Sequence, residues 1–369
     1  MSTTLLDAPP RPTALKGRAL RAAVIGTGKI SEEHLRFLAG EPGVELAAVC
    51  DLSPSLAKYA ATRFKAAAAF SDSVQMLREA RPDVVHVLTP PHTHWALVSD
   101  ALNAGAHVVV EKPVAPTNAK FRELWKLAQD CGRQIVEDHN YRFNEPILAI
   151  EELVARGELG EVREVDVRMA LPIRKAGGRY ADENLPHPSH NLPAGVIHEF
   201  ITHLCYLALR FLPPGDELRV AAAWSKHGAE ALFKYDDLDA LVISGPVHAR
   251  IRFTSHSGPD CFTVTVRGTR GWAETDLFQP NLRVVVPRKG GQQLSPLVNQ
   301  LLNGVNLMGA SVRGFRNKVM QKTPYEGLRT FLNRTYAALR EDKEPPVSYH
   351  DMDRASRLVD GLLENASRM

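Results

Sequence analysis

The chain has 369 residues, of which 44% are hydrophobic and 24% charged, and its formal net charge is +3. These values are typical of a folded protein with one large or two smaller domains, and they exclude a disordered or collagen-like chain. The near balance of 45 basic and 42 acidic residues argues against a nucleic-acid partner.

Cysteine usage and hydropathy suggest the compartment. The four cysteines (Cys50, Cys131, Cys205 and Cys261) are far apart and form no CxxC pair, so they predict reduced thiols rather than disulfides or a zinc site. No apolar run reaches the ~18 residues that a membrane span requires, and we find no secretion signal. We therefore expect a cytoplasmic protein.

The first part of the chain alternates short apolar strands with helical segments, after an expected flexible tail over residues 1–18. The expected strands are 22–25, 45–50, 83–88, 107–110 and 134–136, and the expected helices are 30–39, 54–64, 73–79, 95–103 and 117–130. Strands that are apolar on both faces, each followed by a helix, indicate a doubly wound parallel sheet. We predict an N-terminal Rossmann domain over residues 19–143.

The pattern then changes, and from Val162 longer strands alternate between apolar and polar positions. We expect strands at 165–169, 220–225, 240–253 and 262–266, a strongly apolar helix at 195–211, and helices from about residue 294 to the end. Such alternation favours an open, mostly antiparallel sheet with one exposed face. We predict a second α/β domain for substrate binding and oligomerisation over residues 144–369, whose last helices could pack back on the first domain.

A glycine-containing turn lies where the first strand meets the first helix, with the sequence Gly26-Thr27-Gly28-Lys29-Ile30-Ser31. The first glycine permits a tight turn, and the second lets the backbone approach a pyrophosphate at the positive end of the helix. Ser31 replaces the third glycine of the usual fingerprint. Asp51, which closes the second strand, is placed to bind the adenine-ribose hydroxyls and would repel a 2′-phosphate. The pattern predicts NAD as cofactor and makes NADP less favoured.

Several further motifs occur in an order that resembles the Gfo/Idh/MocA oxidoreductases (glucose–fructose oxidoreductase, inositol dehydrogenase and relatives). They are Thr89-Pro90-Pro91-His92-Thr93-His94, Glu111-Lys112-Pro113, Asn140-Tyr141-Arg142-Phe143, Gly268-Thr269-Arg270-Gly271 and Pro345-Pro346-Val347-Ser348. The resemblance implies that Thr89, Pro90, His94, Glu111 and Lys112 lie along the cofactor. It also implies a substrate site on the second domain, for which we select Tyr141, Arg142 and His198.

Oxidation of a secondary alcohol requires a base for the hydroxyl proton. Lys112 follows a strand at the carboxyl edge of the first sheet, where its ammonium could stabilise alkoxide charge. The family commonly has DxxxH at the apolar helix, and this chain has Glu199 and His203, four residues apart and hence on one helix face. We predict His203 as the base, with its pKa lowered by a cation such as Lys112, and Glu199 as a residue that orients substrate or His203.

Histidines 187, 190, 198 and 203 crowd one region with Glu199, but their spacing matches no zinc-protease motif, so we predict no catalytic metal. The loop 182–193 is instead expected to contact a polar substrate.

Residues 277–325 contain no aspartate or glutamate. Their cations are Arg283, Arg288, Lys289, Arg313, Arg316, Lys318 and Lys322, with apolar residues between them. Three interpretations remain open: an oligomer-facing or solvated helical insertion, a site for a phosphate-bearing substrate, and a peripheral membrane contact through residues 294–322.

The sequence therefore predicts an enzyme, an NAD(P)-dependent oxidoreductase acting on CH–OH groups. We expect a homo-oligomer that oxidises or reduces a secondary alcohol on a sugar, inositol or nucleotide sugar. The alternatives are a redox-assisted NAD-dependent glycosidase and a non-catalytic sugar and NAD sensor.

Overall fold

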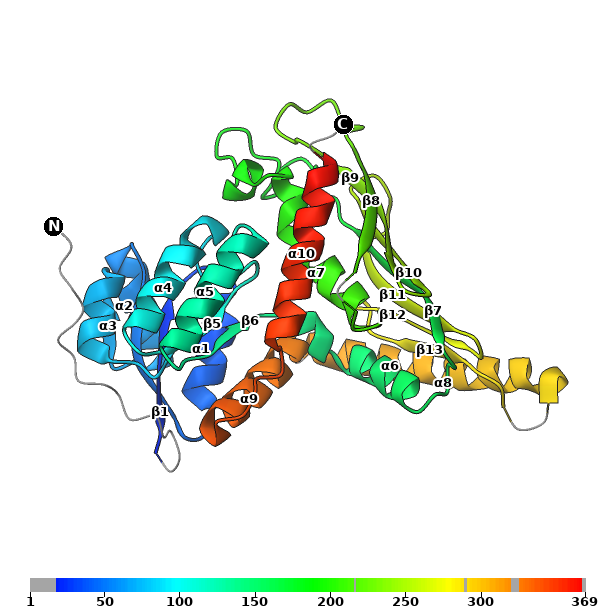
Figure 1. Ribbon diagram of the computed structural model, residues 1–369, viewed down its shortest axis with the longest axis horizontal. Coiled ribbons are helices and arrows are strands. Elements are labelled where there is room, and N and C mark those ends of the chain that lie inside the picture. The colour runs from blue at the N-terminus through cyan, green and yellow to red at the C-terminus, as the bar shows by residue number, and fades with distance from the viewer. Residues whose placement is uncertain (1–17, 216, 289–290, 320–324, 367–369) are drawn as a thin grey trace. The chain divides into compact units, whose positions relative to one another are not determined.

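The computed structural model describes residues 18–215, 217–288, 291–319 and 325–366, so the expected tail, apart from its last residue, lies outside the described part. The chain divides into two compact units (Figure 1). Unit 1 contains the described residues up to His139 together with Leu328–Ser356, and unit 2 contains Asn140–Gly327 together with the residues from Arg357 onward.

Unit 1 is built on a six-stranded parallel sheet of order β3-β2-β1-β4-β5-β6, which confirms the predicted doubly wound fold. Its strands are β1 (Leu20–Ile25), β2 (Val44–Cys50), β3 (Ala68–Phe70), β4 (Val84–Val87), β5 (His107–Val110) and β6 (Ile135–Glu137). The helices that follow them are α1 (Ser31–Gly40), α2 (Pro54–Phe64), α3 (Ser73–Ala80), η1 (Pro91–Thr93), α4 (His94–Asn103) and α5 (Asn118–Asp130). The edge strand β3 was not predicted, because it has three residues and two are alanines.

Two closing helices contribute to the core of unit 1. They are α9 (Glu326–Glu341) and the beginning of α10 (Tyr349–Ala366). Tyr336 of α9 is fully buried and its ring meets that of Phe37 of α1 edge-on, with centroids 5.5 Å apart. Tyr349 of α10 stacks on Phe121 of α5 at 5.7 Å. Aromatic burial of this kind therefore holds the C-terminal helices against α1 and α5.

Unit 2 contains a seven-stranded sheet of order β13-β12-β11-β7-β10-β9-β8, in which β7 and β10 pair in parallel and all other neighbours are antiparallel. The strands are β7 (Val162–Ala170), β8 (Arg219–Ser225), β9 (Asp237–Ser244), β10 (Val247–Thr254), β11 (Cys261–Gly268), β12 (Trp272–Asp276) and β13 (Leu282–Val285). The mostly antiparallel sheet was predicted. The single strand expected at 240–253 is wrong, because a turn at Gly245, with a φ of 54°, folds it into the β9–β10 hairpin.

The sheet of unit 2 has one covered and one open face. The apolar residues of β7 and β10 alternate with polar ones, and the apolar set packs against α7 (His198–Leu209). The opposite side carries charged pairs such as Arg252 with Asp166, at 3.0 Å. The remaining elements are η2 (Asn140–Phe143), α6 (Glu145–Ala155), η3 (Pro188–Asn191), η4 (Gly195–Ile197) and α8 (Gly291–Val319). Among the described helices, none is both long and apolar enough to cross a membrane.

Candidate cofactor and substrate sites

The predicted phosphate loop lies at the carboxyl end of β1. Gly26 has a φ of 95°, and a Cβ added there would meet backbone atoms of Leu88 at 2.9 Å, so only glycine fits the turn. Gly28 is exposed, and a Cβ on it would meet nothing within 4 Å, which leaves its backbone open to a ligand. Helix α1 begins at Ser31 with no side chain capping its N-terminus. These features fit a loop that binds a pyrophosphate through backbone N–H groups.

Asp51 holds this loop in place through hydrogen bonds. Its Oδ2 accepts hydrogen bonds from the Thr27 N–H at 2.8 Å and the Thr27 hydroxyl at 2.7 Å, and its Oδ1 accepts from the Ser53 N–H at 2.9 Å. Burial alone would raise the pKa of Asp51, but these donors outweigh it and lower the pKa, so the carboxylate is ionised at neutral pH. The sequence pointed to Asp51 as a ribose ligand but did not show that it also fixes Thr27.

His94 connects two loops at the same sheet edge. Its Nδ1 lies 2.7 Å from the Pro113 carbonyl oxygen and its Nε2 lies 2.7 Å from the Thr89 carbonyl oxygen. Burial lowers the pKa of His94, while hydrogen bonding to the two carbonyls opposes that shift. Because the ring is fully buried, we expect it to affect a cofactor through the segments it holds, which include Lys112.

Behind this edge, three ligating groups converge. His34 of α1, Glu111 and Asp138 place one ligand atom each within 4.8 Å of one another, and no other group of three in the described residues meets this criterion. Burial raises the pKa of Glu111 to about 7, and the charge of Asp138 adds to the shift. Two carboxyl groups in one buried site favour sharing a proton. The same donor set has the chemistry of a divalent cation site, and the predicted absence of a catalytic metal stays a prediction.

His34 of this cluster is linked through polar contacts to two further buried rings, those of His86 and Tyr336. The Nδ1 atoms of His34 and His86 lie 2.9 Å apart, and His86 Nε2 lies 2.8 Å from the Tyr336 hydroxyl. Burial lowers the pKa of His34 to about 4, so both rings are neutral at neutral pH, since burial also lowers the pKa of His86. One N–H between the two Nδ1 atoms then fixes opposite tautomers on the two rings. Sequence reasoning missed this network.

The raised pKa of Glu111 predicts a pH-dependent stability. A carboxyl group that titrates at about 7 in the folded chain and near 4.5 in the unfolded chain stabilises the fold fully below 4.5, and loses that contribution as pH rises through 7. Relative to Glu111→Gln, the wild type should lose roughly 3 kcal/mol of unfolding free energy between about pH 5 and about pH 8. Urea unfolding at both pH values measures this difference.

The matched control for that experiment is Glu123→Gln, which changes an exposed glutamate of α5. The unfolding free energy of this control should change with pH as that of the wild type does. If the unfolding free energies of the wild type and of Glu111→Gln changed with pH in parallel, Glu111 would already be ionised in the folded chain over this range.

In unit 2, His203 of α7 is held by its neighbour one turn along. Its Nδ1 lies 2.9 Å from the Tyr206 hydroxyl, which donates to Asn140 Oδ1 at 3.2 Å and accepts the Tyr141 N–H at 3.2 Å. Because this hydroxyl donates its proton to Asn140, it accepts at His203, so Nδ1 carries the imidazole N–H. The lone pair of neutral His203 is then on Nε2. Tyr206 was not predicted, although its spacing of three residues from His203 places it on the same helix face.

Glu199, the other predicted residue of α7, bonds to the loop that follows β7. Arg179 donates to its Oε1 at 3.2 Å, and the Ser189 hydroxyl donates to its Oε2. The His187 ring lies 3.9 Å from Oε2, and burial lowers the pKa of that histidine. The loop residues 177–179 and 181–188 line a cavity of about 870 Å³. Glu199 therefore fixes the loop that was expected to contact a polar substrate.

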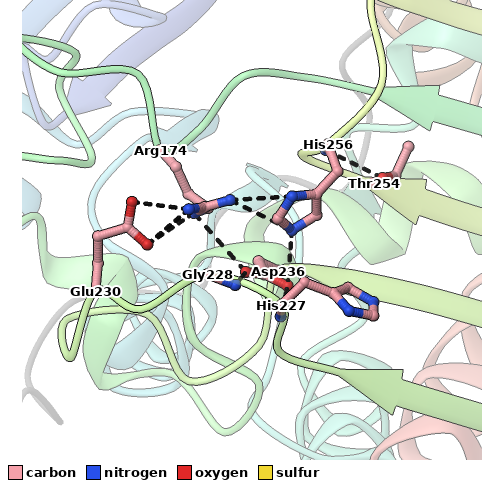
Figure 2. A network of polar contacts seen from close by, with 7 residues as sticks. All are labelled: Arg174, His227, Gly228, Glu230, Asp236, Thr254 and His256. Carbon is pink, nitrogen blue, oxygen red and sulfur yellow. Dashed lines mark hydrogen bonds and ion pairs between the residues drawn. The ribbon is translucent and has the colours of Figure 1, made fainter.

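The beginning of this loop is anchored by a buried carboxylate, shown in Figure 2. Asp236, with no exposed surface, accepts the N–H groups of His227 and Gly228 at 2.9 and 2.7 Å, and His256 Nε2 lies 3.1 Å from its Oδ1. Burial would raise the pKa of Asp236, but these donors lower it. Arg174 of the loop reaches Nδ1 of His256 at 3.0 Å. The network joins the loop to the segments after β8 and β10.

The predicted substrate residues differ in exposure. Tyr141 is half-buried, and its ring packs edge-on against that of His203 at 4.9 Å. Arg142 and His198 are buried, with 6% and 3% of their surface exposed. Lys112, at the end of β5, is half-buried in unit 1. Roles for these four residues in binding or catalysis stay predictions.

Comparison with known proteins finds a family model that matches the first part of the chain. Residues 20–139 match the Gfo/Idh/MocA model, described as an oxidoreductase family with an NAD-binding Rossmann fold. A D-glucoside 3-dehydrogenase of Escherichia coli is 34% identical over 166 residues, covering 45% of this chain and 46% of that one. The chain spans about half the length of the curated relatives it matches.

Solved structures extend the likeness of fold to nearly the whole chain. The WlbA dehydrogenase of Bordetella pertussis, in complex with NADH and UDP-GlcNAcA, superposes with a TM-score of 0.71 at 18% identity, covering 96% of this chain and 97% of that one. KijD10, a 3-ketoreductase of Actinomadura kijaniata in complex with NADP and TDP-benzene, gives 0.68 at 18% identity, with coverage of 94% and 98%. Residues 20–139 are therefore similar to the NAD-binding Rossmann part of the Gfo/Idh/MocA oxidoreductases, and the likeness of fold extends over nearly the whole chain.

Proposed function

We propose that this protein is an NAD-dependent oxidoreductase that oxidises or reduces a secondary alcohol of a sugar, inositol or nucleotide sugar. The observation that carries the proposal is the contact between Asp51 and Thr27, which fixes the phosphate loop and an ionised carboxylate at the same sheet edge. The relatives support the substrate class, since they include an enzyme of D-glucosides and a structure in complex with the nucleotide sugar UDP-GlcNAcA.

The residues of unit 1 fit a dinucleotide. Gly26 and Gly28 leave the backbone accessible, the N-terminus of α1 attracts phosphate, and Asp51 retains acceptor capacity for ribose hydroxyls. Nicotinamide, when bound, supplies the electron sink for the carbon that is oxidised. The protein has to bind the substrate, orient it and handle its proton.

Two side chains perform this proton chemistry in our proposal. The Nε2 lone pair of His203 takes the hydroxyl proton during oxidation, and Tyr206 holds the ring in the required tautomer through Nδ1. Lys112 stabilises the charge that develops on the substrate oxygen. Glu199 acts indirectly in this proposal. It holds Ser189 and Arg179 of the loop that contacts the sugar.

The cofactor preference gives a first test. In Asp51→Asn the carboxylate charge is lost while the size of the side chain is kept, so NAD should bind on the order of 10- to 100-fold more weakly and NADP should be less strongly excluded. Thr27→Val is the matched control, because it removes one donor to Asp51 and keeps the charge. We expect the control to retain its preference for NAD. Isothermal titration of both cofactors measures the effect, and tighter binding of NADP by the wild type would contradict the proposal.

A further inference from the structure

Helix α8 carries an exposed apolar face in unit 2. Eight apolar residues recur at alternating spacings of four and three, at Leu294, Val298, Leu301, Val305, Met308, Val312, Phe315 and Val319. All except the half-buried Val298 are exposed, with exposed fractions that reach 69% at Val312 and 73% at Phe315. An apolar stripe of this length on a surface marks an interaction site.

The orientation of α8 is fixed by the opposite, polar side of the helix. Asn303 donates to the Val284 carbonyl at 3.0 Å and accepts the Val284 N–H at 2.9 Å. Asn299 donates to the Val286 carbonyl at 2.8 Å, and Ser295 accepts the Arg288 N–H at 2.9 Å. These side chains satisfy backbone groups of the edge strand β13 and of the segment after it. The helix therefore turns its polar side to the sheet and its apolar side outward.

The second half of α8 has weak intrinsic helix propensity. Gly304, Gly309 and Gly314 each cost about 1 kcal/mol relative to alanine in an exposed helix, and Val305, Val312 and Val319 add smaller penalties. Among the residues that the structure describes, the bonds from α8 to β13 and the following segment come from residues up to Asn303. A partner on the apolar face would supply the stabilisation that helices in water usually take from packing.

The charge of this region indicates which partner fits. No acidic residue occurs between Asp276 and Glu326, while Arg313 and Arg316 project from the second half of the helix. Both arginines are exposed and form no ion pair with any residue that the structure describes. A second copy of this helix would bring further cations and no compensating carboxylate. Anionic lipid headgroups would supply the missing negative charge, and lipid acyl chains would cover the leucines and valines.

We propose that α8 is a membrane-surface helix that lies in the interface of an anionic lipid bilayer with Leu301, Val305, Val312 and Phe315 immersed. The arginines beside this face contact the lipid headgroups. The inference rests on unit 2 and does not depend on the proposed oxidoreductase activity.

Flotation of the full-length protein with lipid vesicles tests this proposal. The wild type should bind vesicles of phosphatidylcholine with added phosphatidylglycerol, bind pure phosphatidylcholine much less, and dissociate at high salt. Val312→Ser combined with Phe315→Ser should weaken binding on the order of 100-fold, because two immersed side chains lose their apolar contact. Arg313→Gln combined with Arg316→Gln should weaken it about 30-fold.

Matched controls come from α3 of unit 1, where Val74 and Arg78 are also exposed. Val74→Ser and Arg78→Gln should bind like the wild type. Failure of the wild type to bind anionic vesicles would overturn the proposal. So would a concentration-dependent dimer in sedimentation velocity that Val312→Ser abolishes, since the apolar face would then be an interface between two copies.

Discussion

His203→Asn is expected to lower the turnover number by on the order of 10²–10⁴ and to remove the acidic limb of the pH profile. The amide of asparagine can take the place of Nδ1 and keep the bond to Tyr206, but it offers no lone pair in place of Nε2. In the wild type, oxidation should accelerate with pH as the imidazole loses its proton. Steady-state rates across pH with the identified substrate measure both effects.

Tyr206→Phe separates positioning from proton transfer. Tyr206 is buried, so phenylalanine keeps its packing and removes only the hydroxyl that orients the His203 ring. We expect a loss of about 10-fold with the acidic limb retained, because Nε2 is still present but the tautomer is less constrained. An unchanged pH profile in His203→Asn would refute His203 as the base.

Lys112→Met should lower the turnover number by on the order of 10²–10³ while cofactor affinity and fold persist. Methionine has a length close to that of the lysine stem and removes only the ammonium, to which we assign the stabilisation of the substrate oxygen. The control is Lys120→Met, which changes an exposed cation of α5 paired with Glu123. Near-wild-type turnover in Lys112→Met, measured beside unchanged NAD titration, would contradict the role given to Lys112.

The architecture of unit 1 could be predicted because its strands are apolar on both faces and separated by amphipathic helices. The strands β12 and β13 were not predicted, since they have only five and four residues. The β9–β10 hairpin was taken for one strand, although the buried positions change from even-numbered residues in β9 to odd-numbered residues in β10 across Gly245. Pattern alone therefore located the sheets better than their turns.

Some residues of the candidate site could be located from the sequence and others could not. Gly26, Gly28 and Asp51 were found because their spacing along a strand and a helix start is a local signal. The group formed by His34 and Asp138 was not found, because its members are far apart in sequence and polar residues are ordinarily expected at the surface. Only the fold shows that these groups are buried together.

The central claim, redox chemistry on a sugar carbon, is tested most directly with a substrate deuterated at the carbon to be oxidised. The substrate would come from a screen of glucosides, inositols and nucleotide sugars with NAD. We expect equal amounts of NADH and keto product, with the deuterium on the reduced cofactor. Release of a leaving group without net NADH would contradict this account and identify a redox-assisted glycosidase. Binding of NAD and sugar without turnover would contradict it as well, and would identify a sensor.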